Sequence, residues 1–189
     1  MLYHISNKQR DVLGGARMTM PLKFVHLCDS LCVVSMVNGK WATGDKCVFP
    51  GCRKSLRWGM YALQHQWRFG AATDEGEFLV HRVRALNSLA DFYANHILDS
   101  GRDCIEYMVP CTVAAGDMLV LCTDGASRDN LGAASAGAVL HVVHDGQLHV
   151  VAVSAICLGL ATSSCAEFEA ACLGQTLLTK WCRFAGVCV

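Results

Sequence analysis

The sequence predicts a single domain of the α/β class, in which strands and helices alternate before a final run of strands and one long helix. Its 189 residues suffice for one compact core but not for two. Hydrophobic residues make up 53% of the chain and charged residues 17%, which excludes a disordered chain and favours a densely packed interior. Residues 1–20 show no hydrophobic period, so we expect an N-terminal arm followed by one domain over 21–189.

The first expected elements follow from a β-rich stretch and two capping residues. A strand is predicted over 22–28, and Asp29 and Ser30, which are both favourable N-cap residues, come directly after it. A short helix should follow and stop at Asn38. Apolar residues at helical spacing then predict a second helix over 53–69.

Three further elements are expected before the middle of the chain ends. Alternation predicts a strand over 76–85, and helical spacing predicts a third helix over 88–99. The apolar residues expected on the buried side of this helix are Leu89, Phe92 and Ile97. Residues 100–117 have no sustained period and contain Gly and Pro, so we expect a linker between the halves 21–99 and 118–189.

The second half of the chain predicts consecutive strands and a helix. A strand over 117–125 is followed by a hairpin over 136–159, in which Asp145 and Gly146 indicate a type I′ turn. A long helix is expected over 161–182. The residues on its buried face should be Ala166, Ala170, Leu173, Leu177 and Trp181.

Charge and hydropathy exclude several classes of protein. Lysine plus arginine number 16, as do aspartate plus glutamate, so the formal net charge is zero and no overall basic field attracts nucleic acid. The most apolar stretch, 138–161, is interrupted by polar residues and is not expected to span a membrane. The first ten residues lack the apolar core of a secretory signal, so an intracellular protein, nuclear or cytoplasmic, is expected.

The twelve cysteines are expected to be mostly buried thiols rather than disulfides. Those inside apolar runs include Cys122, Cys157 and Cys172. Two other pairs, Cys28 with Cys32 and Cys47 with Cys52, have looser spacing than a structural zinc site. His65 still leaves the second pair one ligand short, so metal binding by thiolates is the less favoured interpretation.

Two segments of the second half carry acidic residues in a distinctive order. Asp124 ends a strand and precedes a glycine-containing turn, and Glu167 lies near the start of the long helix. This order resembles the opening of a type 1 ribonuclease H domain, in which an Asp ends the first strand and a Glu lies in a T-N-N-x-A-E motif. The chain departs from that pattern at Leu131, where the family usually has Pro, and at Ser163 and Ser164, which replace two Asn residues.

The first half supplies the features that such a domain still lacks. The segment FVHLCDSLCVV around Asp29 resembles the Asp-Ser junction between strand and helix in this family. Residues 80–99 resemble its last strand and helix, with Asn87 and Asp91 at the spacing of its N-x-x-x-D motif. The motifs therefore occur in circularly permuted order, and a window cut across two tandem copies would give the same order.

The resemblance implies a ribonuclease H-like α/β fold, circularly permuted, with a five-stranded mixed sheet flanked by helices. It also implies an endonuclease that hydrolyses the RNA strand of RNA–DNA hybrids with two Mg²⁺ or Mn²⁺ ions, and an origin in a retroelement. In that family's pattern Asp124 bridges both ions, Glu167 and Asp29 complete one site, and Asp91 helps the other. Substrate contacts are implied for Ser30, Ser127, Asn130, Ser163 and Ser164.

Each acid also has a structural interpretation. Asp29, Asp91 and Glu167 suit helix capping, and Asp124 suits a turn. The coincidence of all four with one family pattern favours a catalytic site over four separate structural roles. Two alternatives to an active enzyme remain open, namely a catalytically inactive remnant and a half-site module that folds by exchange with a second copy. We expect a monomer, because the predicted linker reaches roughly 60 Å when extended.

Two further features of the sequence each allow two interpretations. A histidine near the position of His81 assists proton transfer in many members of the family, whereas histidines on strands are more often structural. A basic and aromatic segment either follows a phosphate backbone or forms a solvated helix face. Its residues are Arg53, Lys54, Arg57, Trp58, Trp67 and Arg68.

Overall fold

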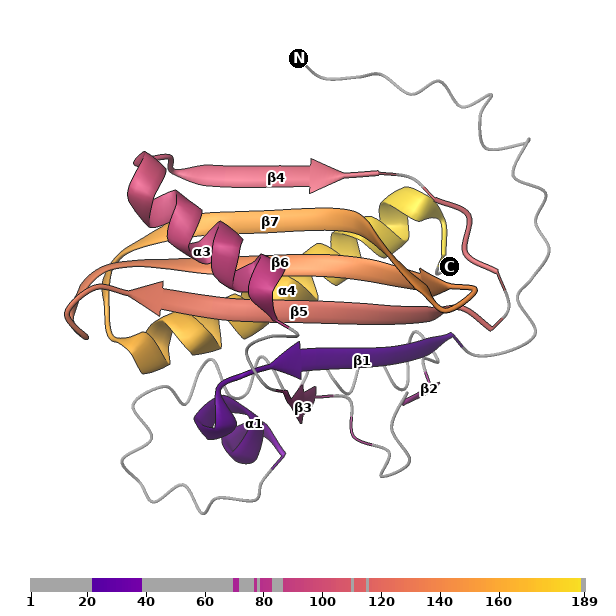
Figure 1. The fold of residues 1–189 in the computed structure, drawn as a ribbon, viewed down its shortest axis with the longest axis horizontal. Coiled ribbons are helices and arrows are strands. Elements are labelled where there is room, and N and C mark those ends of the chain that lie inside the picture. The colour runs from indigo at the N-terminus through magenta and orange to yellow at the C-terminus, as the bar shows by residue number, and fades with distance from the viewer. Residues whose placement is uncertain are drawn as a thin grey trace.

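A computed structural model of the chain describes residues 22–38, 70–71, 77, 79–82, 87–109, 111–114 and 116–187. Within these residues seven strands form one mixed sheet with three helices packed around it (Figure 1). The predicted α/β class is therefore confirmed. The expected arm, the helix over 53–69, the basic and aromatic segment, and Cys47, Cys52 and His65 lie outside the described residues.

The sheet has the strand order β2-β1-β5-β6-β7-β4, and β3 also pairs with β1. The strands span Lys23–Cys28 (β1), Gly70–Ala71 (β2), Leu79–His81 (β3), Cys104–Met108 (β4), Met118–Ser127 (β5), Gly132–His144 (β6) and Gln147–Ala161 (β7). β1 runs parallel to β2, β3 and β5, whereas β5, β6, β7 and β4 run antiparallel to one another in turn. This mixed sheet is compatible with a ribonuclease H-like fold, but it has seven strands rather than the expected five.

The segment 100–117 is not the plain linker that its irregular pattern predicts. It contains β4, which pairs antiparallel with β7 so that Cys104 lies opposite Ile156 and Met108 opposite Ala152. Because β4 lies at the edge of the sheet, its side chains are exposed or only half-buried. An edge strand of this kind needs no alternation of apolar residues, which is why the sequence pattern did not reveal it.

Helices cover both faces of the sheet (Figure 1). They are α1 (Leu31–Val37), α3 (Ser88–Ser100) and α4 (Ser163–Ala185). α3 lies on one face, and α4 crosses the other, where it forms the largest hydrophobic core with β1, β5, β6 and β7. No helix within the described ranges has the length and the apolar character that a membrane span requires.

The buried face of α4 agrees with its periodicity. Ala166, Ala170, Leu177 and Trp181 are buried, and Leu173 is half-buried against the same core. Trp181 also donates a hydrogen bond from Nε1 to the carbonyl oxygen of the residue after β4, over 3.0 Å. This bond satisfies the one polar atom that the fully buried indole carries.

The buried face of α3 differs from the prediction. Ile97 is buried as expected, but Leu89 and Phe92 are exposed. Ala90 and Ala94 take their place, because the helix lies so close to β6 that a Cβ atom at residue 137, which is a glycine, would overlap with the backbone of α3. A search for large apolar side chains does not detect a helix face that packs through small residues.

Two further expectations can be compared with the structure. The turn between β6 and β7 has positive φ at Asp145 (48°) and at Gly146 (75°), which confirms the predicted type I′ hairpin. Cys122 is buried as expected, whereas Cys172 is half-buried and Cys157 is exposed. Cys157 lies in the last part of β7, where no residue is fully buried, so its apolar neighbours in sequence do not bury it.

Candidate functional site

Asp29 and Asp124 meet because β1 and β5 are parallel neighbours. Cys28 at the end of β1 lies opposite Thr123 in β5, so the residues that follow them, Asp29 and Asp124, occupy the same edge of the pairing. Asp124 is part of β5 and is only 2% exposed, which excludes its interpretation as a turn residue. Strand pairing therefore joins two carboxylates that are far apart in the sequence.

Glu167 reaches the same place because α4 lies directly on β5. At Gly125 a Cβ atom would overlap with the backbone of Ala166 and Glu167, so only a glycine allows this approach. The Asp-Gly sequence at the site thus has two functions. The aspartate supplies a carboxylate, and the glycine lets the helix bring the next carboxylate to it.

The three carboxylates line one cavity of about 320 Å³. Its walls come from the end of α3, from β5 and the turn after it, and from the start of α4. Besides Asp29, Asp124 and Glu167, the lining residues are Asn95, Leu98, Gly125, Ala126, Ser127, Arg128 and Ser163. The predicted acids are thereby brought together, with the exception of Asp91.

Burial and like charge change the protonation of Asp124. Burial raises the pKa of Asp124 to about 9, and the carboxylates of Glu167 and Asp29, a hydrogen bond with Asp29, and the charge of Asp91 act in the same direction. The protein alone therefore holds a proton on Asp124 at neutral pH, because burial disfavours its charged form and the neighbouring carboxylates repel a further anion.

Asp91 influences this cavity without lining it. It lies in the first turns of α3, where its carboxylate accepts a hydrogen bond from Nδ2 of Asn95 over 3.2 Å. Asn95 itself lines the cavity. Asp91 is thus close enough for its charge to raise the pKa of Asp124. Asp91 does not line the cavity itself but contacts Asn95, which does.

Asn87 fixes the start of α3 against β5. It is the N-cap residue, is 1% exposed, and donates from Nδ2 to the carbonyl oxygen of Thr123 over 2.7 Å and to Oδ1 of Asp124 over 3.5 Å. The sequence marked Asn87 only as part of the N-x-x-x-D spacing. Its contacts indicate a positioning role toward Asp124.

The helix caps are made by residues other than the acids. Ser30 caps α1 by accepting from the amide of Val33, and Thr162 caps α4 by accepting from the amide of Cys165 over 3.2 Å. Glu167 is five residues after the cap of α4, and a capping box requires three. Capping therefore does not explain the positions of Asp29 or Glu167.

The predicted substrate-binding residues divide into two groups. Ser127 and Ser163 line the cavity, and Ser127 donates its hydroxyl to the carbonyl oxygen of Ala161 over 2.7 Å. Asn130 lies outside the lining and accepts a hydrogen bond from the amide of Ser163 over 3.2 Å, which supports the start of α4. Ser30 and Ser164 also lie outside it, since Ser30 serves as a cap and Ser164 is exposed.

His81 touches the backbone of the site. It ends β3, opposite Cys28 in β1, and its Nε2 donates to the carbonyl oxygen of Asp29 over 3.0 Å. The proton on Nε2 is engaged by this carbonyl oxygen, so the structural interpretation of His81 is favoured for that nitrogen.

The donor atoms at the site suit a hard divalent cation. Ligand atoms of Cys28, Asp29 and Glu167 lie within 4.8 Å of one another. Burial and the neighbouring carboxylates raise the pKa of Cys28, so the thiol stays protonated and is a poor ligand. Oδ1 of Asp29 is buried and has no hydrogen-bond partner among the described residues. The remaining oxygen donors are those that Mg²⁺ and Mn²⁺ prefer.

Sequence reasoning considered Cys28, whose Sγ lies near ligand atoms of Asp29 and Glu167, only as half of a thiolate pair. It also missed Asn95 and Arg128 on the cavity wall, because neither carries a motif. Their positions depend on the approach of α3 and of the turn after β5, which no local pattern encodes.

Comparison of the chain with protein-family models, with curated proteins and with solved structures finds no match.

Proposed function

We propose that this protein is a metal-dependent nuclease that hydrolyses the RNA strand of RNA–DNA hybrids. The observation that carries the proposal is the convergence of Asp29, Asp124 and Glu167, from three separate elements, on one cavity. Such a cluster is unfavourable in an apoprotein unless something offsets the repulsion of its charges, and a divalent cation does so.

In this proposal Asp29, Asp124 and Glu167 would hold the metal, and Asp91 would add negative charge from behind the wall. A bound Mg²⁺ or Mn²⁺ supplies a more acidic water molecule and neutralises charge on the cleaved phosphate. Asn87 keeps Asp124 in place through its amide, and His81 keeps the backbone of Asp29 in place. Loss of the proton from Asp124 would accompany metal binding, since its carboxylate is needed as a ligand.

The preference for RNA would come from contacts with the 2′-hydroxyl group, which DNA lacks. Ser127 and Ser163 supply polar groups on the cavity wall, and Asn95 supplies an amide. We expect a monomer in which β1 pairs with β5 of the same chain, and the oligomeric state stays a prediction. The retroelement origin and the permuted history remain predictions.

The test is cleavage of a labelled RNA–DNA hybrid by the purified chain, with Mg²⁺ or Mn²⁺ and with EDTA. We expect cleavage only with metal, and its loss in Asp124→Asn and Glu167→Gln. Asp145→Asn is the matched control, because it makes the same chemical change in an exposed hairpin turn where Asn tolerates the positive φ. A folded parent protein that cleaves no hybrid, RNA duplex or DNA duplex would leave the inactive remnant as the better account.

A further inference from the structure

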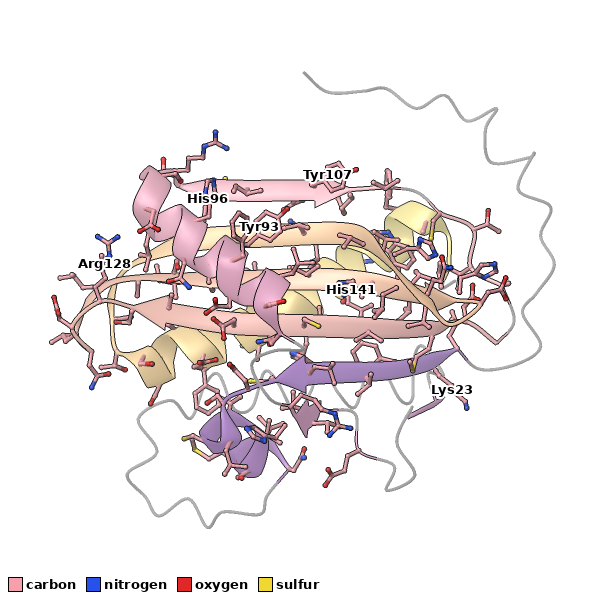
Figure 2. The ribbon with its side chains drawn as sticks, viewed as in Figure 1. Lys23, Tyr93, His96, Tyr107, Arg128 and His141 are labelled. Carbon is pink, nitrogen blue, oxygen red and sulfur yellow. The ribbon has the colours of Figure 1, made fainter. Side chains whose placement is uncertain are left out.

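Arg128 is the one cation among the described residues that line the carboxylate cavity. It follows β5 directly, at the end of the sheet where the chain turns into β6 (Figure 2). A nucleic-acid strand entering this cavity meets three carboxylates, and the chain has no net positive charge to offset them. A local cation is therefore needed on the path of the substrate.

The backbone of Arg128 is firmly held. The amide of Arg128 donates to the carbonyl oxygen of Ala133 over 2.9 Å. A Cβ atom on Gly132 would overlap with the carbonyl oxygen of Arg128, so the two backbone segments lie close together. Asp129 and Asn130 have positive φ values of 58° and 52°, which closes the turn tightly. The side chain thus starts from a fixed point at the rim of the cavity.

The guanidinium group makes an ion pair with Asp99 near the end of α3. Nη2 of Arg128 lies 2.6 Å from Oδ1 of Asp99, and the two side chains are 57% and 70% exposed. Exposed ion pairs contribute little to stability because water and salt screen them. The guanidinium can therefore exchange this partner for another anion at small cost.

We propose that Arg128 binds a phosphate group of the substrate other than the one cleaved, and that Asp99 holds and competes for its guanidinium. Arg128 lies four positions after Asp124, which corresponds to about 13 Å of extended strand, so the two residues face different phosphates. The planar guanidinium suits paired hydrogen bonds to phosphate oxygens. This inference rests on the proposed nuclease function and names a contact that fixes the position of the substrate.

The test is steady-state cleavage of a hybrid by Arg128→Gln, Asp99→Asn and Arg183→Gln. We expect Arg128→Gln to raise KM about tenfold with little change in kcat, and to make the dependence of log KM on log salt shallower by about 0.9. Asp99→Asn should lower KM about threefold, because it frees the guanidinium. Arg183→Gln removes the same charge from an exposed position in the last turn of α4 and should behave as the parent.

A second measurement identifies the phosphate. Single uncharged methylphosphonate linkages are placed in turn along the RNA strand and along the DNA strand. One position, away from the cleaved linkage, should raise KM for the parent and have no further effect in Arg128→Gln. If Arg128→Gln does not fold, the same methylphosphonate scan is applied to the parent and to Asp99→Asn. The position at which the change in KM differs between these two proteins identifies the phosphate.

The outcomes separate the inference from the proposed function. A parent that cleaves hybrids while Arg128→Gln keeps the parental KM and salt dependence overturns only the role of Arg128. An effect of Arg128→Gln on kcat alone also overturns the role of Arg128. So does a methylphosphonate scan in which every position that raises KM for the parent also raises KM for Arg128→Gln. A parent that cleaves no hybrid overturns both.

Discussion

The imidazole of His81 donates a hydrogen bond from Nε2 to the backbone carbonyl oxygen of Asp29, over 3.0 Å. The two residues are 52 positions apart in sequence and meet because β3 and β1 are parallel neighbours. The bond holds the backbone carbonyl of the first residue after β1 against the end of β3. His81 therefore acts on the site through Asp29.

We expect His81→Ala to lower the rate of metal-dependent hydrolysis about tenfold, as is typical when a residue that orients a metal ligand is lost. His81→Gln keeps an N–H donor and should retain most of the activity. His149→Ala, at an exposed position in β7, is the control. The pH profile of hydrolysis should keep its shape in His81→Gln, because His81 positions Asp29 and transfers no proton. Equal losses in the Ala and Gln variants would contradict this role.

The raised pKa of Asp124 makes stability depend on pH. Its pKa rises from an ordinary value of 3.8 to about 9 in the folded protein, so the folded state binds the proton more tightly than the unfolded chain. This contribution is complete below about pH 4 and is lost as the pH rises toward about 9. Without metal, the melting temperature of the parent should therefore fall over this range more steeply than that of Asp124→Asn.

Added metal should reverse the order of the melting temperatures of the parent and Asp124→Asn. Mg²⁺ or Mn²⁺ that binds only the folded state raises the melting temperature of the parent. Asp124→Asn loses a ligand, so its melting temperature should rise less, although without metal it melts no lower than the parent. Identical metal-induced shifts in both proteins would show that Asp124 is not a ligand. Asp145→Asn again serves as the control.

The contact between Gly125 and α4 predicts a large loss of stability when Gly125 is replaced. Gly125→Ala places a methyl group against backbone atoms of Ala166 and Glu167, which cannot move without shifting the helix. We expect the free energy of unfolding to fall by about 3 kcal/mol. Gly174→Ala meets side-chain methyl groups of Thr123 and Leu121 instead of backbone, and the higher helix propensity of alanine offsets part of the overlap, so it should cost about 1 kcal/mol. Denaturant unfolding of both variants tests this, and similar losses would argue against the close approach at Gly125.

At the other end of the sheet, His144 and Asp117 form a pH-dependent pair. Nδ1 of His144 lies 2.8 Å from Oδ1 of Asp117, whose Oδ2 accepts from the amide of Ala114 over 2.7 Å. The hydrogen bond with Asp117 raises the pKa of His144 above 6.5, so its contribution to stability is complete below pH 6.5 and is lost as the pH rises through the folded value. His144→Gln should be less stable than the parent in acid and equal to it in base. A difference in stability that is independent of pH would exclude this pair as its source.

Local patterns in the sequence were sufficient for elements whose physics is local. The hairpin turn needs only Asp145 and Gly146 to adopt positive φ, and the face of α4 follows from its helical spacing. Local position gave Asp124 and Glu167 only the interpretations of a turn residue and a capping residue. The resemblance to a family pattern was needed to join them to Asp29, because no short-range pattern reports strand pairing.

The missed features depend on tertiary packing. β4 is an edge strand and needs no buried face, and α3 packs through Ala90 and Ala94 because residue 137 is a glycine. Arg128 reaches the cavity only after the turn that follows β5 has closed. Asp91 was expected among the ligands, but Asn95, one turn further along α3, lies on the wall, and Asp91 acts on Asp124 through its charge.

The pairing of β1 with β5 also has a consequence for biosynthesis. Lys23 lies opposite Met118, and Cys28 lies opposite Thr123, so the partners in each pair are 95 positions apart in the sequence. At about 5–20 residues per second, a ribosome needs about 5–20 s to produce the partner strand after β1 has been made. During that interval one edge of an apolar strand has no β5 to cover it, and it is exposed to chaperones and to neighbouring nascent chains.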